Sequence, residues 1–252
     1  MKTIRNLIPA LILVSLLGLT TACATQPREE NLTPPQRSFE FVERPESVLI
    51  SDPIEPFNRA MYNFNARFDR YVFLPVVSGY EWIMPNVAQK GVSNFFVNFR
   101  EPINLVNNVL QFKVKNSGVT LSRFVINTTI GLAGFFDPAT KFGLYVRKED
   151  FGQSMGKWGI GGGPFIVLPL FGPSNLRDTI GLVADAAMEY NLDLLDTKND
   201  SNKDGVRYGV MALKAIDMRK NTAFRYFETG TPFEYELIRF AFKNIREEQI
   251  NK

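Results

Sequence analysis

The sequence predicts a mainly α-helical protein in one domain, and three observations support this fold class. Apolar residues recur at steps of three and four in several segments, which is the spacing of one helical face. Alternation with a period of two, expected of a half-buried strand, hardly occurs. The 252 residues, 45% hydrophobic and 22% charged, are typical of a folded chain and are enough to bury a substantial core.

The composition excludes several classes of function. The chain has no histidine, which removes Ser-His-Asp and Cys-His nucleophiles and histidine-based metal sites, and its one cysteine cannot form an internal disulfide. Residues 1–22 contain Lys2 and Arg5 and no acid, so the formal charge falls from +3 for the whole chain to +1 without them. Nucleic-acid binding requires a strong basic field, and we expect no nucleic-acid partner.

The N-terminus predicts a lipoprotein signal peptide over residues 1–22. Lys2 and Arg5 form a charged start, Leu7–Leu19 is apolar but too short to span a membrane, and small residues precede Cys23. Cys23 stands where a bacterial lipoprotein carries its acyl chains, and we interpret it as the lipid anchor. The alternative is an ordinary signal peptide followed by an incidental cysteine. Ala24 after the cysteine resembles lipoproteins sent to the outer membrane.

Residues 23–51 are expected to form an extended tether, and residues 52–252 the helical domain. The tether contains four prolines among polar residues and shows no sustained period. The domain opens with an apolar stripe at steps of four and three, which predicts a first helix; the stripe comprises Phe57, Met61, Phe64, Phe68 and Tyr71. We expect Pro75 and Gly79 to break the chain after it.

Prolines suggest where the next helices begin. Pro85 is expected to open a second helix and Pro102 a third, because proline is favoured in a first helical turn. On the third, Ile103, Val106 and Leu110 are expected to form the inner face. Asn116 or Ser117 is expected to cap a fourth helix that runs towards Gly131.

The C-terminal half is expected to contain one strand and three helices. The best strand signal is Phe165–Leu170, and Ser174 is a plausible N-cap for a helix over 176–187. Residues 205–227 and 232–250 predict two further helices.

A polar stripe runs beside the apolar one on the first three predicted helices. Its members are Asn58, Tyr62, Asn65 and Asp69 on the first, Gly91, Asn94 and Asn98 on the second, and Asn104, Asn108 and Gln111 on the third. Rows of uncharged amides are poor helix formers and need a compensating role. They could bond neighbouring helices or face water, or they could line a passage whose wall is part amide and part aromatic. Taken alone, the residues favour the first interpretation.

The segment 151–174 is rich in glycine and predicts a mobile hairpin or lid. Its glycines include Gly152, Gly156, Gly159, Gly161, Gly162 and Gly163. Two hydrolase patterns, G-x-S-x-G and S-x-x-K, fit Ser154 and Lys157 by letter. The chain lacks the histidine base of the first and the companion motifs of the second, so we expect no catalytic residue. Asp200–Gly205 opens like a calcium loop but Met211 replaces the ligating glutamate, so no metal or cofactor is expected.

A series of motifs resembles the MlaA (VacJ) lipoprotein family. In order along the chain they are Asp52–Arg59, Met61–Asn65, Ser93–Phe96 with Glu101–Pro102, Arg123–Asp137, Glu149–Gln153 and Gly163–Asp178. The resemblance covers about residues 52–185, and so many motifs in the same order make it specific. The tether and the region after Leu195 carry no reliable match.

The resemblance implies a ring of amphipathic helices in the outer membrane that encloses an amphipathic channel. It implies removal of phospholipid from the outer leaflet, with a trimeric porin and a periplasmic lipid-carrier protein as partners, and no enzymatic step. The protein would be anchored on the periplasmic side by Cys23. With the resemblance, Asn58, Tyr62, Asn65, Asp69, Asn94, Asn98, Asn104 and Asn108 become candidates for the channel lining.

Phospholipid transport fits these residues, because a headgroup that crosses hydrocarbon without polar partners would face a prohibitive cost in free energy. Two alternatives remain: a non-transporting envelope lipoprotein that docks to a porin, and a lipid hydrolase that uses Ser154 and Lys157.

Overall fold

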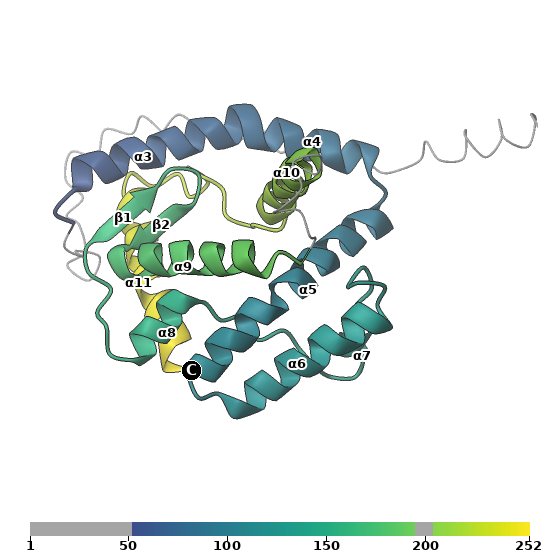
Figure 1. Ribbon diagram of the computed structural model, residues 1–252. Helices are drawn as coiled ribbons and strands as arrows, with labels where there is room; N and C mark the ends of the chain where they lie inside the picture. The colour runs from purple at the N-terminus through teal and green to yellow at the C-terminus, as the bar shows by residue number, and fades with distance from the viewer. Residues whose placement is uncertain (1–51, 195–203) are drawn as a thin grey trace, which may run out of the picture.

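The computed structural model describes residues 52–194 and 204–252, and it is mainly α-helical with one small two-stranded sheet (Figure 1). The fold class predicted from the sequence is confirmed. The predictions for the signal peptide, the acylated Cys23 and the tether fall on residues 1–51, outside the described part of the chain.

The first helix is longer than predicted. α3 (Glu55–Phe68) continues through a π-helical turn, η3 (Asp69–Phe73), into α4 (Leu74–Ile83), so the expected break at Pro75 and Gly79 is wrong. A proline cannot donate a backbone hydrogen bond and crowds the carbonyl four residues earlier. The π turn lies immediately before Pro75, which stands in the first turn of α4, and it changes the hydrogen-bond register there. The run ends at Met84, in an extended conformation before Pro85.

The second and third predicted helices are one helix, α5 (Asn86–Leu110). Pro85 opens it as predicted, but Pro102 lies inside it and begins no helix of its own. The helix contacts α6, α8, α9 and α10 along its length, and this packing on both sides of Pro102 outweighs the missing hydrogen bond. Tertiary packing therefore overrides the local proline signal.

α6 (Val114–Thr129) returns beside α5 and ends towards Gly131 as predicted. It begins before Asn116 and Ser117, and no side chain caps it, so the predicted cap is wrong. α7 (Pro138–Lys141) follows as a single short turn whose N-cap, Asp137, accepts a hydrogen bond from the Thr140 backbone N–H at 3.1 Å.

The glycine-rich segment divides into a helix and a hairpin. α8 (Phe151–Lys157) contains Gly152 and Gly156, so these two glycines belong to a helix and not to the predicted hairpin. The hairpin is formed by β1 (Phe165–Leu168) and β2 (Gly172–Asn175), which pair antiparallel with Phe165 opposite Asn175 and Leu168 opposite Gly172.

The remaining helices follow the predictions with shifted ends. α9 (Leu176–Leu192) is capped by Asn175, whose side chain accepts from the Asp178 N–H, and not by Ser174. α10 (Asp204–Lys220) stops seven residues before the predicted end at 227, and α11 (Glu234–Asn251) fits the last predicted helix. In Figure 1 the α3–α4 run, α5, α8 and the hairpin surround α9.

The interior of this arrangement is unusually polar. One apolar cluster, formed by Tyr62, Phe165, Val167 and Tyr235, joins α3, β1 and α11. Across the described residues, 24 polar or charged side chains are buried against only ten hydrophobic ones. Only part of the inner face predicted for the third helix is buried: Ile103 is fully buried, whereas Val106 is 37% exposed. The apolar stripe predicted for the first helix is only partly buried: Phe57 of α3 is 50% exposed and Tyr71 of η3 71%, whereas Met61 packs against the apolar cluster.

Candidate functional site

The amide stripe of α3 attaches the hairpin to the rest of the fold. Asn58 donates from Nδ2 to the Phe165 carbonyl at 3.0 Å and accepts the Val167 N–H at 2.8 Å. Asn65, two helical turns later, donates to the Leu168 carbonyl at 2.9 Å and accepts the Leu170 N–H at 2.7 Å. Each amide therefore satisfies one donor and one acceptor of the hairpin backbone, as a neighbouring strand would.

The other two members of this stripe attach the C-terminal region. Tyr62 donates its hydroxyl to Glu234 at 2.6 Å, and burial, together with this hydrogen bond, raises the pKa of the Tyr62 phenol. Asp69 forms an ion pair with Arg219 of α10, with a distance of 2.6 Å from Oδ2 to Nη2. The polar face of α3 and η3 thus holds β1, α10 and the start of α11.

The amides of the first half of α5 bind the end of α6 and the loop that follows it. Asn94 donates to the Phe135 carbonyl at 3.1 Å, and Asn98 donates to the Thr128 hydroxyl at 3.0 Å. At Gly91 a side chain would overlap the ring of Phe135, so a glycine is required for this close approach.

In the second half of α5 the amides hold the segment before α8. Asn104 donates to Glu101 at 3.3 Å and accepts the Glu149 N–H at 3.3 Å. Asn108 donates to the Asn104 carbonyl at 2.8 Å. All eight candidates therefore bind other parts of the chain. Their place on a channel wall stays a prediction, while their contacts indicate a structural role.

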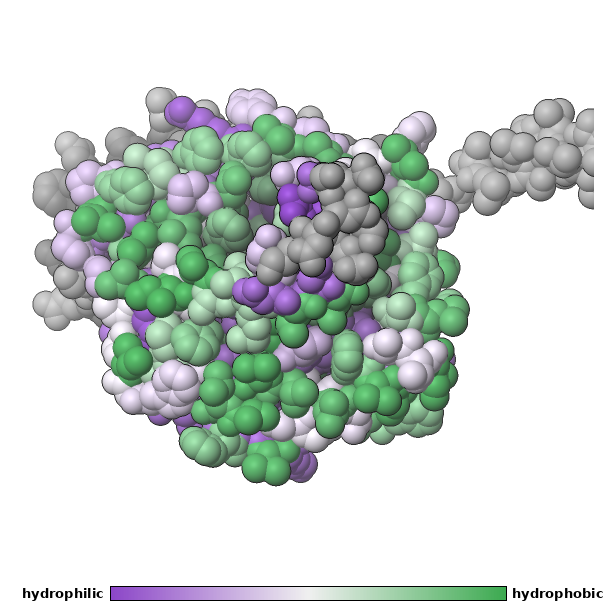
Figure 2. All heavy atoms as spheres, viewed as in Figure 1, coloured by the Kyte–Doolittle hydropathy of each residue, from purple (hydrophilic) through white to green (hydrophobic). Residues whose placement is uncertain are grey.

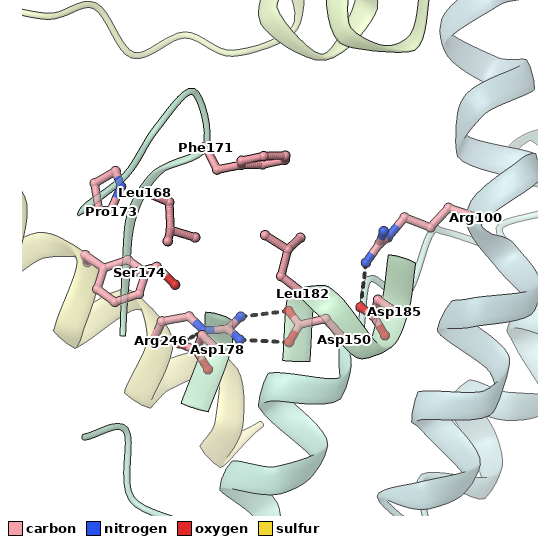
Figure 3. Close-up of a pocket in the computed structure, with 11 residues that line it drawn as sticks. Arg100, Asp150, Leu168, Phe171, Pro173, Ser174, Asp178, Leu182, Asp185 and Arg246 are labelled. Carbon is pink, nitrogen blue, oxygen red and sulfur yellow. Dashed lines mark hydrogen bonds and ion pairs between the residues drawn. The ribbon is translucent and has the colours of Figure 1, made fainter. Parts of the chain in front are cut away.

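A different set of residues lines an open cavity of about 230 Å³ between α9, the hairpin and α11 (Figure 3). The hairpin contributes Leu168 and Phe171, and α9 contributes Leu182, so part of the wall is apolar. Charged side chains complete it, among them Arg100 and Arg246. The lining is apolar and ionic, whereas the sequence suggested a passage walled by amides and aromatics, and none of the eight candidates contributes to this cavity.

The charged part of the wall is a network of ion pairs. Arg246 of α11 grips both oxygens of Asp150 at 2.8 Å and also binds Asp178 at 2.8 Å (Figure 3). Arg100 pairs with Asp185 at 2.9 Å. Burial opposes ionisation of Asp150, but the hydrogen bonds and charge of Arg246 outweigh it and lower the pKa of that carboxyl. Burial raises the pKa of Asp185, and Arg100 only partly compensates.

The amide and glycine patterns of the sequence did not point to these residues. Asp178 and Asp185 lie seven residues apart and share one face of α9. Two acids at that spacing on a mainly apolar helix are a signal of a buried ionic network. Their partners Arg100 and Arg246 lie in distant segments, and the sequence gives no direct way to pair them.

Ser154 is not arranged as a nucleophile. It is fully buried on α8, where its hydroxyl donates to Asn107 Oδ1 at 2.8 Å and accepts from Gln111 Nε2 at 3.2 Å. Lys157 is exposed at the end of the same helix. Among the described residues no group of three or more Cys, Asp or Glu side chains is placed to hold a metal ion.

The glycines have two separate roles. Gly152 of α8 lies against Gly181 of α9, where a side chain on Gly181 would overlap the Gly152 backbone. Gly159 and Gly163, in the connection to β1, have φ values of +87° and +70°, which favour glycine. Gly161 and Gly162 lie in the same connection. The mobility of this segment stays a prediction.

The outer surface carries many large apolar side chains. Figure 2 shows hydrophobic residues gathered over the part of the surface formed by α5 and α6. Val114 of α6 is 81% exposed, and Phe112, just before it, is 87% exposed. In the described ranges, no helix has both the length and the hydrophobicity required to cross a bilayer.

Comparisons with known proteins agree on one family. The sequence model described as MlaA lipoprotein matches residues 50–249. A protein of Escherichia coli K12, named intermembrane phospholipid transport system lipoprotein MlaA, is 40% identical over 139 residues, or 54% of this chain and 55% of that protein. An uncharacterized protein of Rickettsia conorii is 32% identical over 206 residues, or 81% of this chain and 79% of that one.

A solved structure supports the same relationship. It comes from work on the structural basis for maintenance of bacterial outer membrane lipid asymmetry, and it matches with a TM-score of 0.64 and 27% sequence identity. The match covers 80% of this chain and 100% of that chain. By sequence, the chain spans only about half the length of several curated relatives, including those of Escherichia coli and Shigella flexneri.

Proposed function

Because the chain belongs to the MlaA lipoprotein family, we propose that it removes phospholipids from the outer leaflet of the outer membrane and passes them to a periplasmic carrier. The lipid would move through an amphipathic passage within the helical domain, and no bond would be made or broken. The family is one of lipid-transport lipoproteins, and the protein is not an enzyme.

The observation that carries the proposal is the inverted polarity of the domain. Buried polar side chains outnumber buried apolar ones, 24 to ten, and apolar residues such as Trp82 and Val87, both over 70% exposed, lie on the surface. In water each exposed square ångström of apolar surface costs about 25 cal/mol, so many large exposed apolar side chains together favour contact with lipid or a protein partner. Amphipathic helices lying in the plane of the bilayer fit this distribution.

We place the passage beside the cavity lined by the hairpin, α9 and α11. Leu168, Phe171 and Leu182 offer an apolar wall for acyl chains, and the ion pairs of Arg100 and Arg246 offer a polar wall for the headgroup. A headgroup is stabilised by hydrogen bonds to such groups, whereas bare hydrocarbon would impose a large desolvation cost.

A porin-docking protein without transport is the second candidate, and the inward pairing of the amides favours it. Four of the amides bind other parts of the chain: Asn58, Asn65, Asn98 and Asn104. The amide stripes are therefore no longer an argument for a lined passage. The exposed apolar surface would serve a porin as well as lipid. The two candidates differ in what happens to surface phospholipid.

The decisive experiment deletes the gene and measures outer-leaflet phospholipid by labelling intact cells with an amine-reactive reagent that does not cross the membrane. Transport predicts a rise in labelled phosphatidylethanolamine that the wild-type gene reverses. Unchanged labelling would reject transport and leave docking as the better interpretation. A complementing gene with Ser154→Ala should behave as wild type, whereas lost function would favour the hydrolase alternative.

The anchor and the partners extend the proposal. We expect Cys23→Ser to lose its acyl chains and its firm retention in the outer membrane, as measured by radiolabelled palmitate and membrane fractionation.

A photo-crosslinking residue at Phe112 or Val114 should capture the trimeric porin, because these side chains are among the most exposed apolar ones. A crosslinker at the exposed Lys252 is the control, since it lies on the charged end of the chain.

A further inference from the structure

A second cavity, of about 410 Å³, lies on the other side of Arg246 and is strongly basic. Arg246 and Phe242 line both this cavity and the one described above, so one stretch of α11 separates the two. Four cations line it, Arg177 from α9 and Arg239, Lys243 and Arg246 from α11, against the single carboxylate of Glu247. The three cations of α11 are spaced by four and three residues, which places them on one helical face.

Two of these four cations are already neutralised. Arg177 pairs with Asp178 at 2.9 Å, and Arg246 pairs with Asp150 and Asp178 at 2.8 Å. These pairs fix the two guanidinium groups and leave little net charge for a ligand.

The other two cations are incompletely paired. Arg239 is 3% exposed, and carboxylates of Asp52 and Glu55 lie 3.2 Å and 3.8 Å from its Nη1. Its Nε and Nη1 nevertheless have no hydrogen-bond acceptor among the described residues. A buried donor without an acceptor is costly, and a guanidinium more so. Lys243, one turn further on, has only a loose contact of 3.9 Å with Glu247, and both of those side chains are more than half exposed.

The geometry points to a site for a phosphate group in this cavity, held by Arg239 and Lys243. Residues at i and i+4 on a helix lie close enough for their side chains to reach a single anion, and a phosphate supplies the acceptors that Arg239 lacks. The inference rests on the proposed function in that it identifies the phosphate as that of a transported phospholipid headgroup.

Three apolar residues favour a lipid over a free ion. Phe165, Phe242 and Ile250 line the same cavity and provide a surface for the glycerol and first methylenes of a lipid beside the phosphate site. The cavity volume is also well above what a phosphate ion alone needs and lies in the range of small-molecule sites.

The test measures binding to the purified full-length protein in a nonionic detergent by titration calorimetry. Three probes are compared: dihexanoyl phosphatidylethanolamine, inorganic phosphate, and dihexanoylglycerol, which lacks the phosphate. The main variant is Lys243→Gln, and because Lys243 is exposed we expect this change to preserve the fold. Lys115→Gln changes another exposed lysine, on α6 and outside the cavity, and is the matched control.

We expect the short-chain phospholipid to bind, with a loss of about tenfold in affinity for Lys243→Gln and none for Lys115→Gln, since one charge-assisted hydrogen bond is removed. Arg239→Lys should also weaken binding, because it keeps the charge and loses the fork of donors. Inorganic phosphate binding as tightly, with the same dependence on Lys243, would keep the phosphate site and assign it to the free ion. Equal binding of dihexanoylglycerol, or no effect of Lys243→Gln, would overturn the inference.

Failure of this inference is distinguishable from failure of the proposed function. If the calorimetry is negative while deletion of the gene still raises outer-leaflet phospholipid, the protein transports lipid without this phosphate site. If deletion leaves surface phospholipid unchanged while the variants lose binding, the site is real and the transport role is wrong.

Discussion

Replacing Asn58 by leucine tests whether the polar face of α3 holds the hairpin in place. Leucine has a similar size but removes both hydrogen bonds to β1, leaving the Phe165 carbonyl and the Val167 N–H without partners. Those residues are only 6% and 1% exposed, so water cannot easily replace the amide. Each buried group left unpaired costs about 1–3 kcal/mol, and we expect Asn58→Leu to lose about 3–4 kcal/mol of unfolding free energy.

The equivalent change at Asn65 should cost less, and the difference makes the prediction sharper. Its partners are the Leu168 carbonyl and the Leu170 N–H, and Leu170 is 48% exposed. Solvent can satisfy part of this loss, so we expect about 1–2 kcal/mol for Asn65→Leu. Asn63→Leu, on the exposed side of the same helix, is the matched control and should stay within about 0.5 kcal/mol of wild type.

Guanidinium unfolding of the detergent-solubilised protein gives the free energies, and hydrogen exchange of the peptide over 165–175 reports on the hairpin itself. Asn58→Leu should speed exchange at the hairpin more than Asn65→Leu, and Asn63→Leu should leave it unchanged. If Asn58→Leu lost less than about 1 kcal/mol, or if all three variants exchanged alike, the amides would not be holding the hairpin.

Three further predictions concern the ion pairs and the helix contact. Arg246→Met should lose about 3 kcal/mol of unfolding free energy, because it leaves Asp150 without its arginine and leaves Asp178 with Arg177 as its only cation. Adding Asp150→Asn should recover part of this loss, and full stability of the single variant would contradict the reasoning. Gly181→Ala should lower the unfolding free energy by about 1–3 kcal/mol, because the added methyl group would overlap α8. Gly79→Ala, with open space around it, is the control and should not lower it. Equal melting temperatures of the two variants would refute the contact. Burial raises the pKa of Asp185, so its contribution to stability is present below about pH 3.9 and is lost as pH rises through the pKa of the folded state. Asp185→Asn should remove this decline in unfolding free energy between about pH 3.5 and 7. An unchanged pH profile would contradict the assignment.

The sequence predicted helices well and their boundaries less well, and the prolines show why. Pro85 marks a true helix start because the residue before it, Met84, is extended, as the steric demand of a proline favours. Pro75 and Pro102 carry the same local signal, yet a π turn accommodates the first and contacts on several sides of α5 hold the second inside a helix. Local chemistry sets the preference, and tertiary packing that the sequence does not display decides the outcome.

The sequence predicts which residues of the candidate site share a helical face, but it does not predict which residues they contact. Periodicity correctly places Asn58 and Asn65 on one face of a helix, but it says nothing about what that face meets. Their partners are more than 100 residues away, in a hairpin whose second strand, Gly172–Asn175, has no strand-like composition. The cavity residues Arg100 and Arg246 are likewise separated by most of the domain.

The usual assumption about which face of an amphipathic helix turns inwards is wrong for part of this fold. In water the apolar stripe of an amphipathic helix turns inwards, and the same rule predicted an inner face containing Val106. On α5 the fully buried residues include Asn107 and Asn108, while Val106 and Val109 are 37% and 56% exposed. Composition cannot detect this inversion, because 45% hydrophobic residues serve equally well inside or outside. Once polar groups bind one another within the fold, the apolar stripes are free to meet a surrounding medium, and a medium that favours them is hydrocarbon and not water.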